Sequence, residues 1–240
     1  MAVGPRPNDL MSRLVIHVEG PTEETFVNEI LRPHLVNFGY TAVWPRIVGN
    51  ARLDRRSGGI KGWPSVRKDL IAHLQANPGC RATTMVDYYA LPRTGGKAWP
   101  GRAEAARLPY GQRAGHVENA LLADIQGRVD YQLGLRFHPF VTMHEFEGLL
   151  FSDCHGFSEG IGRPELEEDF QAIRDQFTSP EEINDSPITA PSKRVEALVS
   201  GYSKPLLGVL AALEIGLAPM RAECPIFRRW LEHLETWLED

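Results

Sequence analysis

The sequence predicts an α/β fold with a central, mostly parallel β-sheet flanked by helices, followed by a helical C-terminal region. Short apolar runs rich in β-branched residues alternate with helical patterns as far as residue 145. After that point helical patterns continue without further strands. Alternation of this kind is typical of parallel sheets with helices on their faces.

The predicted elements divide the chain into a disordered lead-in (1–12), an α/β core (13–155) and a helical region (156–240) that packs on the core. Proline opens the first helix and Gly39 closes it, whereas the second begins at Pro64 or Ser65 and ends at "NPG". The strands are residues 13–19, 41–48, 80–87 and 135–145, and the helices are residues 21–39, 64–79, 116–129, 163–177, 192–202, 205–217 and 224–240. Residues 88–115 form a loop rich in Pro, Gly and Arg, and loops of this length are usually functional.

Bulk composition indicates a soluble, cytoplasmic protein. Among the 240 residues, 42% are hydrophobic and 24% are charged. No apolar run approaches the ~20 residues that cross a bilayer, so we expect no membrane contact. The three cysteines, Cys80, Cys154 and Cys224, are an odd number without close spacing, which argues against a disulfide framework and fits a reducing compartment.

The charge is distributed unevenly. Between Trp44 and Gly115 lie thirteen Lys and Arg but only four Asp and Glu, a net charge of +9; since the whole chain carries −5, the remainder carries −14. A basic segment in an acidic protein suggests a polyanionic partner, although a merely solvated surface remains an equal alternative. The candidate phosphate contacts are Arg52, Arg55, Arg56, Lys61, Arg93, Lys97 and Arg102.

Aromatic residues are interleaved with this basic segment. Trp63, Tyr88, Tyr89, Trp99 and Tyr110 could stack on unpaired bases, as in grooves that bind single-stranded nucleic acid. The alternative is that the tryptophans anchor the core and the loop is simply irregular.

Acidic residues follow three of the predicted strands. Glu19 ends the first strand and Glu23 comes four residues later; Asp87 ends the third, and Glu145 and Glu147 follow the fourth. The carboxyl ends of parallel strands meet at one edge of a sheet, where ligands bind. Crowded carboxylates resist ionisation, and hard divalent cations relieve that repulsion, so the pattern predicts a Mg²⁺ or Mn²⁺ site. Each acid could instead cap a helix or favour its first turn.

Two other kinds of site are less well supported. His138, His144 and the Cys154–His155 pair match no compact zinc motif. "RTGGKAW" lacks the earlier glycine of a phosphate-binding P-loop, so the chain itself is not expected to be an ATPase.

Several motifs carry a family resemblance. "VIHVEGPTEETF" resembles the first motif of Toprim domains, especially those of OLD-type (overcoming lysogenization defect) nucleases. "TTMVDYYALP", "HEFEGLLFSD", "APSKRV" and "CPIFRRWLEHL" resemble a Toprim-like bacterial family of unknown function catalogued under number 4276, over nearly the whole chain from Arg13.

The resemblance implies site residues. Glu19 and Glu23 match the paired glutamates of the first motif, Asp87 matches the first acid of an Asp-x-Asp motif, and Glu145 and Glu147 match the acids after the next strand. Lys193 is a candidate for the lysine near the scissile phosphate. Tyr89 stands where the second acid of Asp-x-Asp would be, and a phenol is a poor Mg²⁺ ligand at neutral pH.

The function implied is that of a metal-dependent (Mg²⁺ or Mn²⁺) endonuclease that hydrolyses phosphodiester bonds in nucleic acid, with DNA favoured over RNA. OLD-type nucleases act with ABC-type ATPases, often in anti-phage defence, so a separate ATPase partner is expected. The alternative is a non-catalytic regulatory subunit of an ATPase complex that senses nucleic acid or metal. Association into a homo-oligomer remains open.

Overall fold

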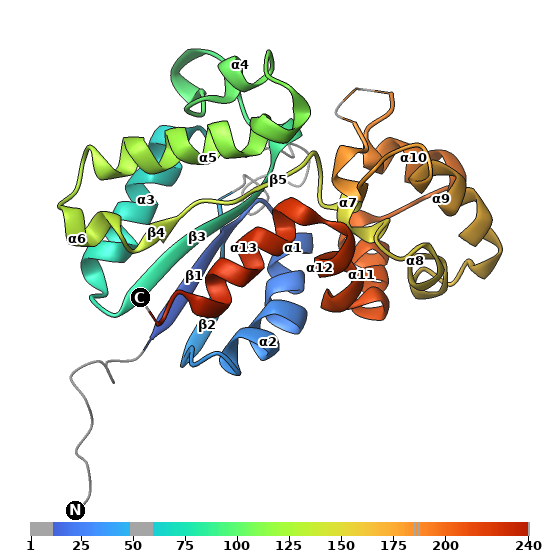
Figure 1. Cartoon of the computed structure of the whole chain (residues 1–240), viewed down its shortest axis with the longest axis horizontal. Helices are drawn as coiled ribbons and strands as arrows, with labels where there is room; N and C mark the ends of the chain where they lie inside the picture. The colour runs from blue at the N-terminus through green and yellow to red at the C-terminus, as the bar shows by residue number, and fades with distance from the viewer. Residues whose placement is uncertain (1–11, 49–59, 185, 187, 240) are drawn as a thin grey trace, which may run out of the picture.

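The computed structural model describes residues 12–48, 60–184, 186 and 188–239 (Figure 1). The predicted lead-in therefore lies almost entirely outside the described residues, as do Arg52, Arg55 and Arg56 of the predicted basic surface.

A five-stranded sheet forms the centre of the fold. Its strands are β1 (Arg13–Val18), β2 (Ala42–Ile47), β3 (Cys80–Asp87), β4 (Phe137–His138) and β5 (Val141–Thr142). The order is β2-β1-β3-β4, with β5 pairing to the end of β3, and every strand pair that the structure describes is parallel. The predicted fold class is confirmed.

The fourth predicted strand is split in two at Pro139, which has no amide hydrogen to give to the ladder. Thr84 of β3 bridges the break with its hydroxyl, which donates to the Phe140 carbonyl at 2.8 Å and accepts from the Phe140 amide at 2.9 Å. The side-chain bonds keep the segment against β3 where regular pairing stops.

Helices cover both faces of the sheet and make up the C-terminal region. They are α1 (Pro21–Phe26), α2 (Arg32–Val36), α3 (Trp63–Ala76), α4 (Arg102–Ala105), α5 (Tyr110–Gln126), α6 (Tyr131–Gly134), α7 (Glu147–Leu150), α8 (Cys154–Gly160), α9 (Glu167–Arg174), α10 (Pro191–Leu198), α11 (Val209–Ile215), α12 (Leu217–Glu223) and α13 (Pro225–Thr236). Two π-helical segments, Val27–Leu31 and Lys204–Gly208, join α1 to α2 and lead into α11.

Several elements differ from the sequence expectation, among them α6 and α12, which were not predicted. The helix expected from residue 116 begins at Tyr110, so the predicted loop is shorter and contains α4. Helix α8 was not predicted, because its sequence "CHGFSEG" is rich in glycine. The Asp153 carboxylate caps it by accepting from the Gly156 amide at 3.0 Å, and its Phe157 ring stacks on Phe170 of α9 with centroids 4.3 Å apart.

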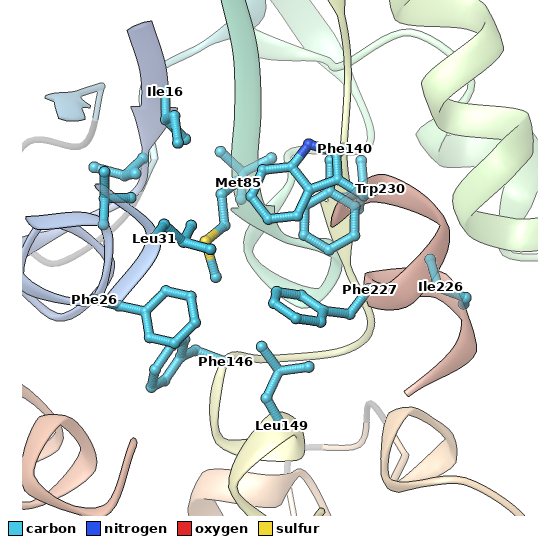
Figure 2. Packing of buried hydrophobic residues seen from close by; sticks show 14 of the residues in the cluster. Ile16, Phe26, Leu31, Met85, Phe140, Phe146, Leu149, Ile226, Phe227 and Trp230 are labelled. Carbon is cyan, nitrogen blue, oxygen red and sulfur yellow. The ribbon is translucent and has the colours of Figure 1, made fainter. Parts of the chain in front are cut away.

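The core lies between the sheet and the helices on its two faces. Helices α3 and α5 cover one face, while α1 and α13 cover the other (Figure 1). On the second face, Met85 of β3, Phe26 of α1 and Phe227 of α13 point toward one another (Figure 2). All three side chains are fully buried.

Helix α13 fixes the C-terminal region to the sheet. The Trp230 indole donates to the Thr83 hydroxyl at 2.9 Å and stacks on Phe140 with centroids 4.3 Å apart. The Tyr40 hydroxyl donates to the Leu234 carbonyl at 2.8 Å. These contacts join segments from the two ends of the chain in one core.

Within the described residues, no helix has both the length and the apolar composition to cross a bilayer by itself. The bent pair of Lys204–Ile215 and Leu217–Glu223, which turns by 85°, has them only when the two parts are taken together.

Candidate functional site

Four predicted acidic residues meet beyond the carboxyl ends of β1 and β3, and we name Glu19, Glu23, Asp87 and Glu147 the acidic cluster. β1 and β3 are neighbours in register, with Val18 opposite Met85, so Glu19 and Asp87 leave the sheet side by side. The chain turns at Gly20 into α1, which brings back Glu23. Glu147 is the first residue of α7.

Lys204 lies among the carboxylates of the acidic cluster. Its ammonium nitrogen is 3.0 Å from Asp87 Oδ2, 3.0 Å from Glu147 Oε2 and 3.3 Å from Glu23 Oε1. Although 30% of the Lys204 side chain is exposed, Glu23, Asp87 and Glu147 are at most 7% exposed. One cation from the C-terminal region thus holds three buried carboxylates together.

Several carboxylate oxygens of the cluster have no hydrogen-bond partner in the described structure. They include Glu19 Oε2, Glu23 Oε1, Asp87 Oδ1 and Glu147 Oε1, all of them buried. Glu23 is better satisfied, because its Oε2 also accepts from the Gly20 amide at 3.0 Å. Leaving a buried carboxylate oxygen without a donor is costly, so these atoms lack a ligand or a proton.

Burial and mutual repulsion raise the pKa values of the carboxyl groups. Burial is the largest cause for Glu19, whose pKa is raised to about 7, with Lys204 opposing and Glu23 adding to the shift. The pKa of Asp87 is raised well above its ordinary value for the same reasons, and that of Glu147 is also raised, chiefly by burial. Without a further cation, the cluster therefore retains protons at neutral pH.

The Lys204 ammonium responds in the opposite sense. Burial alone would lower its pKa, but Asp87, Glu147, Glu23 and Glu19 together raise it well above the ordinary value. Lys204 is therefore charged throughout the physiological range.

Glu145 has a different role from its neighbours. Its Oε2 accepts from the Ser192 amide at 2.9 Å, in the first turn of α10. It is close enough to Glu19 and Glu147 to raise the pKa of each. Glu145 thus lies beside the acidic cluster and ties α10 to it.

Hard oxygen donors of this kind suit Mg²⁺ or Mn²⁺, and the buried oxygens without donors are consistent with that chemistry. As placed, however, no group of three or more His, Cys, Asp or Glu side chains within residues 12–48, 60–184, 186 and 188–239 could hold a metal ion. The carboxylates are spaced around the ammonium at 3.0–3.3 Å, whereas Mg²⁺ requires oxygens at about 2.1 Å. A divalent ion would have to take the place of the Lys204 ammonium.

Lys193, the lysine expected near the phosphate, lies on α10 near the rim of the cluster. It pairs with Glu196 at 2.6 Å, and its side chain is 48% exposed. Its pKa is raised by that hydrogen bond and, more weakly, by Glu145 and Tyr89, so it lies near both.

Other candidate residues have structural partners. His144 is buried between the rings of Tyr88 and Tyr110, and its Nδ1 lies 2.7 Å from the Ile183 carbonyl, an arrangement in which Nδ1 donates. Asp153, the next acid along the chain after Glu147, caps α8.

The described part of the basic segment lies partly on the surface. Arg93 and Lys97 are exposed, and Lys61 is half-buried. Arg102 is a correction: its side chain is fully buried, donates to the Tyr88 carbonyl at 2.8 Å and lies over the Tyr88 ring at 3.6 Å. It cannot reach a nucleic-acid phosphate from this position.

The tryptophans of this segment belong to the core. Trp63 and Trp99 are each 2% exposed, with ring centroids 5.0 Å apart. The Trp99 indole donates to the Lys61 carbonyl at 3.1 Å, and that of Trp63 donates to Asp124 at 2.7 Å. The core alternative therefore holds for both, whereas Tyr89 remains 37% exposed near the acidic site.

Sequence reasoning missed Lys204 and Tyr202. The Tyr202 hydroxyl is buried, and burial and the nearby Glu147 raise its pKa. The sequence signal for Lys204 is "YSKP", in which a lysine stands before a proline that opens a helical segment. This signal does not single out Lys204, because "APSKRV" also places a lysine close to a proline.

A family comparison covers almost the whole chain. The family model described as a domain of unknown function, DUF4276, matches residues 18–235. The chain belongs to this family. No curated protein and no solved structure matches it. The predicted membership of family 4276 is confirmed, and the match includes every residue of the acidic cluster and Lys204.

Proposed function

We propose that this DUF4276 protein is a metal-dependent nuclease, related to the Toprim domain of OLD-type enzymes, that hydrolyses phosphodiester bonds at the acidic cluster. The observation that carries the proposal is the convergence of four carboxylates at the edge of a parallel sheet where ligands bind, three of them within 3.3 Å of a single ammonium. Each of these carboxylates has a buried oxygen without a hydrogen-bond partner in the described structure.

Glu19, Glu23, Asp87 and Glu147 would hold one or two Mg²⁺ or Mn²⁺ ions. When bound, such an ion polarises a phosphodiester and favours deprotonation of an attacking water. The water oxygen bonds to phosphorus and gives up its proton to solvent, the bond to the leaving sugar oxygen breaks, and that oxygen takes up a proton from solvent.

Lys204 would then balance the charge that develops on the phosphate. With the carboxylates neutralised by a divalent ion, its ammonium is free to donate to a phosphate oxygen. Lys193 lies near the same rim and could contact the next phosphate along the strand.

Exposed cations would supply the part of the affinity for nucleic acid that does not depend on its base sequence. Arg93 and Lys97 lie in the segment that leaves the sheet after Asp87, and the Trp99–Lys61 hydrogen bond fixes this segment. Contacts of this kind would recognise the backbone of DNA or RNA alike.

The second candidate function is a regulatory subunit that senses metal or nucleic acid for an ABC-type ATPase. Two observations favour it: Tyr89 replaces a potential second acid, and Lys204 satisfies part of the cluster without metal. A separate ATPase partner is compatible with both candidates.

Cleavage of supercoiled plasmid and of single-stranded DNA and RNA by the purified chain tests the proposal. Mn²⁺ should support cutting and EDTA should abolish it. Glu19→Gln should lower the rate at least about 10²-fold, since even outer partners of metal ligands contribute 10- to 100-fold. Glu29→Gln makes the same charge change at an exposed residue between α1 and α2 and should cut like the parent.

Cutting that persists in Glu19→Gln would place the chemistry elsewhere. Mn²⁺ binding without any cutting would instead support the regulatory subunit, and the assay would then be repeated with an ATPase encoded beside the protein.

A further inference from the structure

The opposite edge of the sheet carries positive charge. Arg13 begins β1, Arg81 is the second residue of β3, and Arg136 directly precedes β4. The strands are in register here, because Leu14 lies opposite Arg81 and the Ala82 amide donates to the Arg136 carbonyl at 2.8 Å. Three guanidinium groups therefore belong to the amino ends of adjacent strands.

A cavity of about 610 Å³ opens at this edge, and we name it the amino-edge pocket. It lies where α6 and the C-terminal end of α13 approach the start of β3 (Figure 1). Its volume falls within the ~300–1,000 Å³ that is usual for small-molecule sites. The residues that matter for recognition are Arg81, Arg136, Leu133, Leu135, His233 and Trp237.

Arg136 is held rigidly by backbone carbonyls. Its Nη1 donates to the carbonyls of Asn77, Pro78 and Cys80 at 2.9–3.1 Å, and its Nη2 donates to that of Leu74 at 2.9 Å. Carbonyl dipoles orient the guanidinium without cancelling its charge. Arg136 thus places a fixed positive charge in the pocket wall.

Unlike Arg136, Arg81 contacts an aromatic ring. Its guanidinium carbon lies 5.7 Å from the centroid of the Trp237 ring. Among residues in the described part of the chain, the Arg81 guanidinium makes no hydrogen bond and no ion pair with a carboxylate. Its donors are therefore available to a ligand, while the aromatic contact holds the side chain at the pocket.

One acid and several apolar groups complete the pocket. Asp130 lines it, but one of its oxygens accepts from the Leu133 amide at 2.8 Å as the cap of α6. Leu135 is 46% exposed, and the His233 ring stacks on His138 with centroids 3.7 Å apart. Two guanidinium groups therefore face one carboxylate, beside an apolar and aromatic wall.

We propose that the amino-edge pocket binds a small organic anion of the nucleoside monophosphate type. Arg81 would donate two parallel hydrogen bonds to the phosphate, and Arg136 would add long-range attraction. The base and sugar would lie against Leu133, Leu135 and the His233 ring. An inorganic phosphate alone would leave this wall uncovered, and a neutral nucleoside would leave Arg81 without a partner.

Titration calorimetry with AMP, adenosine and inorganic phosphate tests the pocket. AMP should bind more tightly than either fragment. Arg81→Gln should weaken AMP binding at least about tenfold, because charge-assisted bidentate bonds are the strong ones. Arg107→Gln removes the same charge from an exposed residue outside the pocket and should bind AMP like the parent.

Gln132→Glu provides a second variant that leaves packing intact, since Gln132 is exposed and lines the pocket. Its added negative charge should also weaken AMP binding. The proposal is overturned if AMP does not bind the parent at millimolar concentration, if adenosine binds as tightly as AMP, or if Arg81→Gln and Gln132→Glu both bind AMP like the parent. None of these outcomes depends on nuclease activity.

Discussion

At the carboxyl edge of the sheet three buried carboxylates share one ammonium, whereas at the amino edge one guanidinium is shared among four backbone carbonyls. The groups around Lys204 are negatively charged carboxylates, whereas the carbonyls around Arg136 carry no net charge. The Arg136 contacts are therefore complete as they stand, while the acidic cluster has an excess of negative charge that protons or a further cation must balance. The two edges should consequently respond in different ways to mutation, metal and pH.

Removal of Lys204 should have the largest effect. Lys204→Met leaves Glu23, Asp87 and Glu147 buried without a counter-charge, and breaking a buried ion pair in this way costs roughly 3–5 kcal/mol. Urea unfolding in EDTA should show this loss, and Mn²⁺ should restore much of it. A Lys204→Met protein as stable as the parent in EDTA would mean that the cluster is not held together by this ammonium.

Removal of Arg136 should have a smaller effect that metal does not rescue. Arg136→Gln loses several charged hydrogen bonds to the carbonyls that end α3 and lead into β3, which we expect to cost about 2–3 kcal/mol. Arg128→Gln is the matched control, because Arg128 is 51% exposed and its pair with Asp124 should contribute less than about 1 kcal/mol. Equal unfolding free energies for the two variants would contradict the role given to Arg136.

The pH dependence of stability should differ in sign between the two edges. Burial, His233 and Arg229 lower the pKa of His138 to about 4, so the folded state holds it neutral while the unfolded chain takes up a proton near pH 6.5. Its contribution is present above pH 6.5 and is lost as the pH falls toward 4. At pH 5 the parent should have lost about 1–2 kcal/mol of its free energy of unfolding through His138, and the His138→Phe variant should not show this loss.

The acidic cluster should behave in the opposite way when metal is absent. Because the pKa of Glu19 is raised from about 4.5 to about 7, the folded state retains a proton that the unfolded chain releases. Its contribution is present below pH 4.5 and is lost as the pH rises through 7. In EDTA, Glu19→Gln should therefore gain stability relative to the parent between pH 5 and 8; a constant difference over this range would contradict the raised pKa.

Much of the fold and of the acidic cluster was predictable, because both follow from local patterns. The β-branched runs marked β1, β2 and β3, and the rule that parallel strands share a carboxyl edge was enough to bring Glu19 to Asp87. Long-range partners were not predictable in this way. Lys204 lies 117 residues after Asp87, in a region without strand and helix alternation, so no periodicity connects it to the sheet.

The basic segment shows a related limit. Arg102 looked like a surface cation because it follows a proline and a glycine in a segment rich in basic residues. In the structure the segment folds back over Tyr88, and the guanidinium stacks on that ring. Charge counting could not distinguish Arg102 from Arg93 or Lys97, since the difference depends on tertiary packing.

Binding of Mn²⁺ measured by titration calorimetry tests the central claim most directly, because it examines the acidic cluster without requiring a substrate or a partner. The parent and Glu29→Gln should bind one or two ions with the same affinity, and Glu23→Gln should bind at least about tenfold more weakly. Glutamine still offers an oxygen to the Gly20 amide, so the turn into α1 is retained. A parent that binds no Mn²⁺ at millimolar concentration, or a Glu23→Gln variant that binds it equally well, would contradict the assignment of the acidic cluster as a metal site.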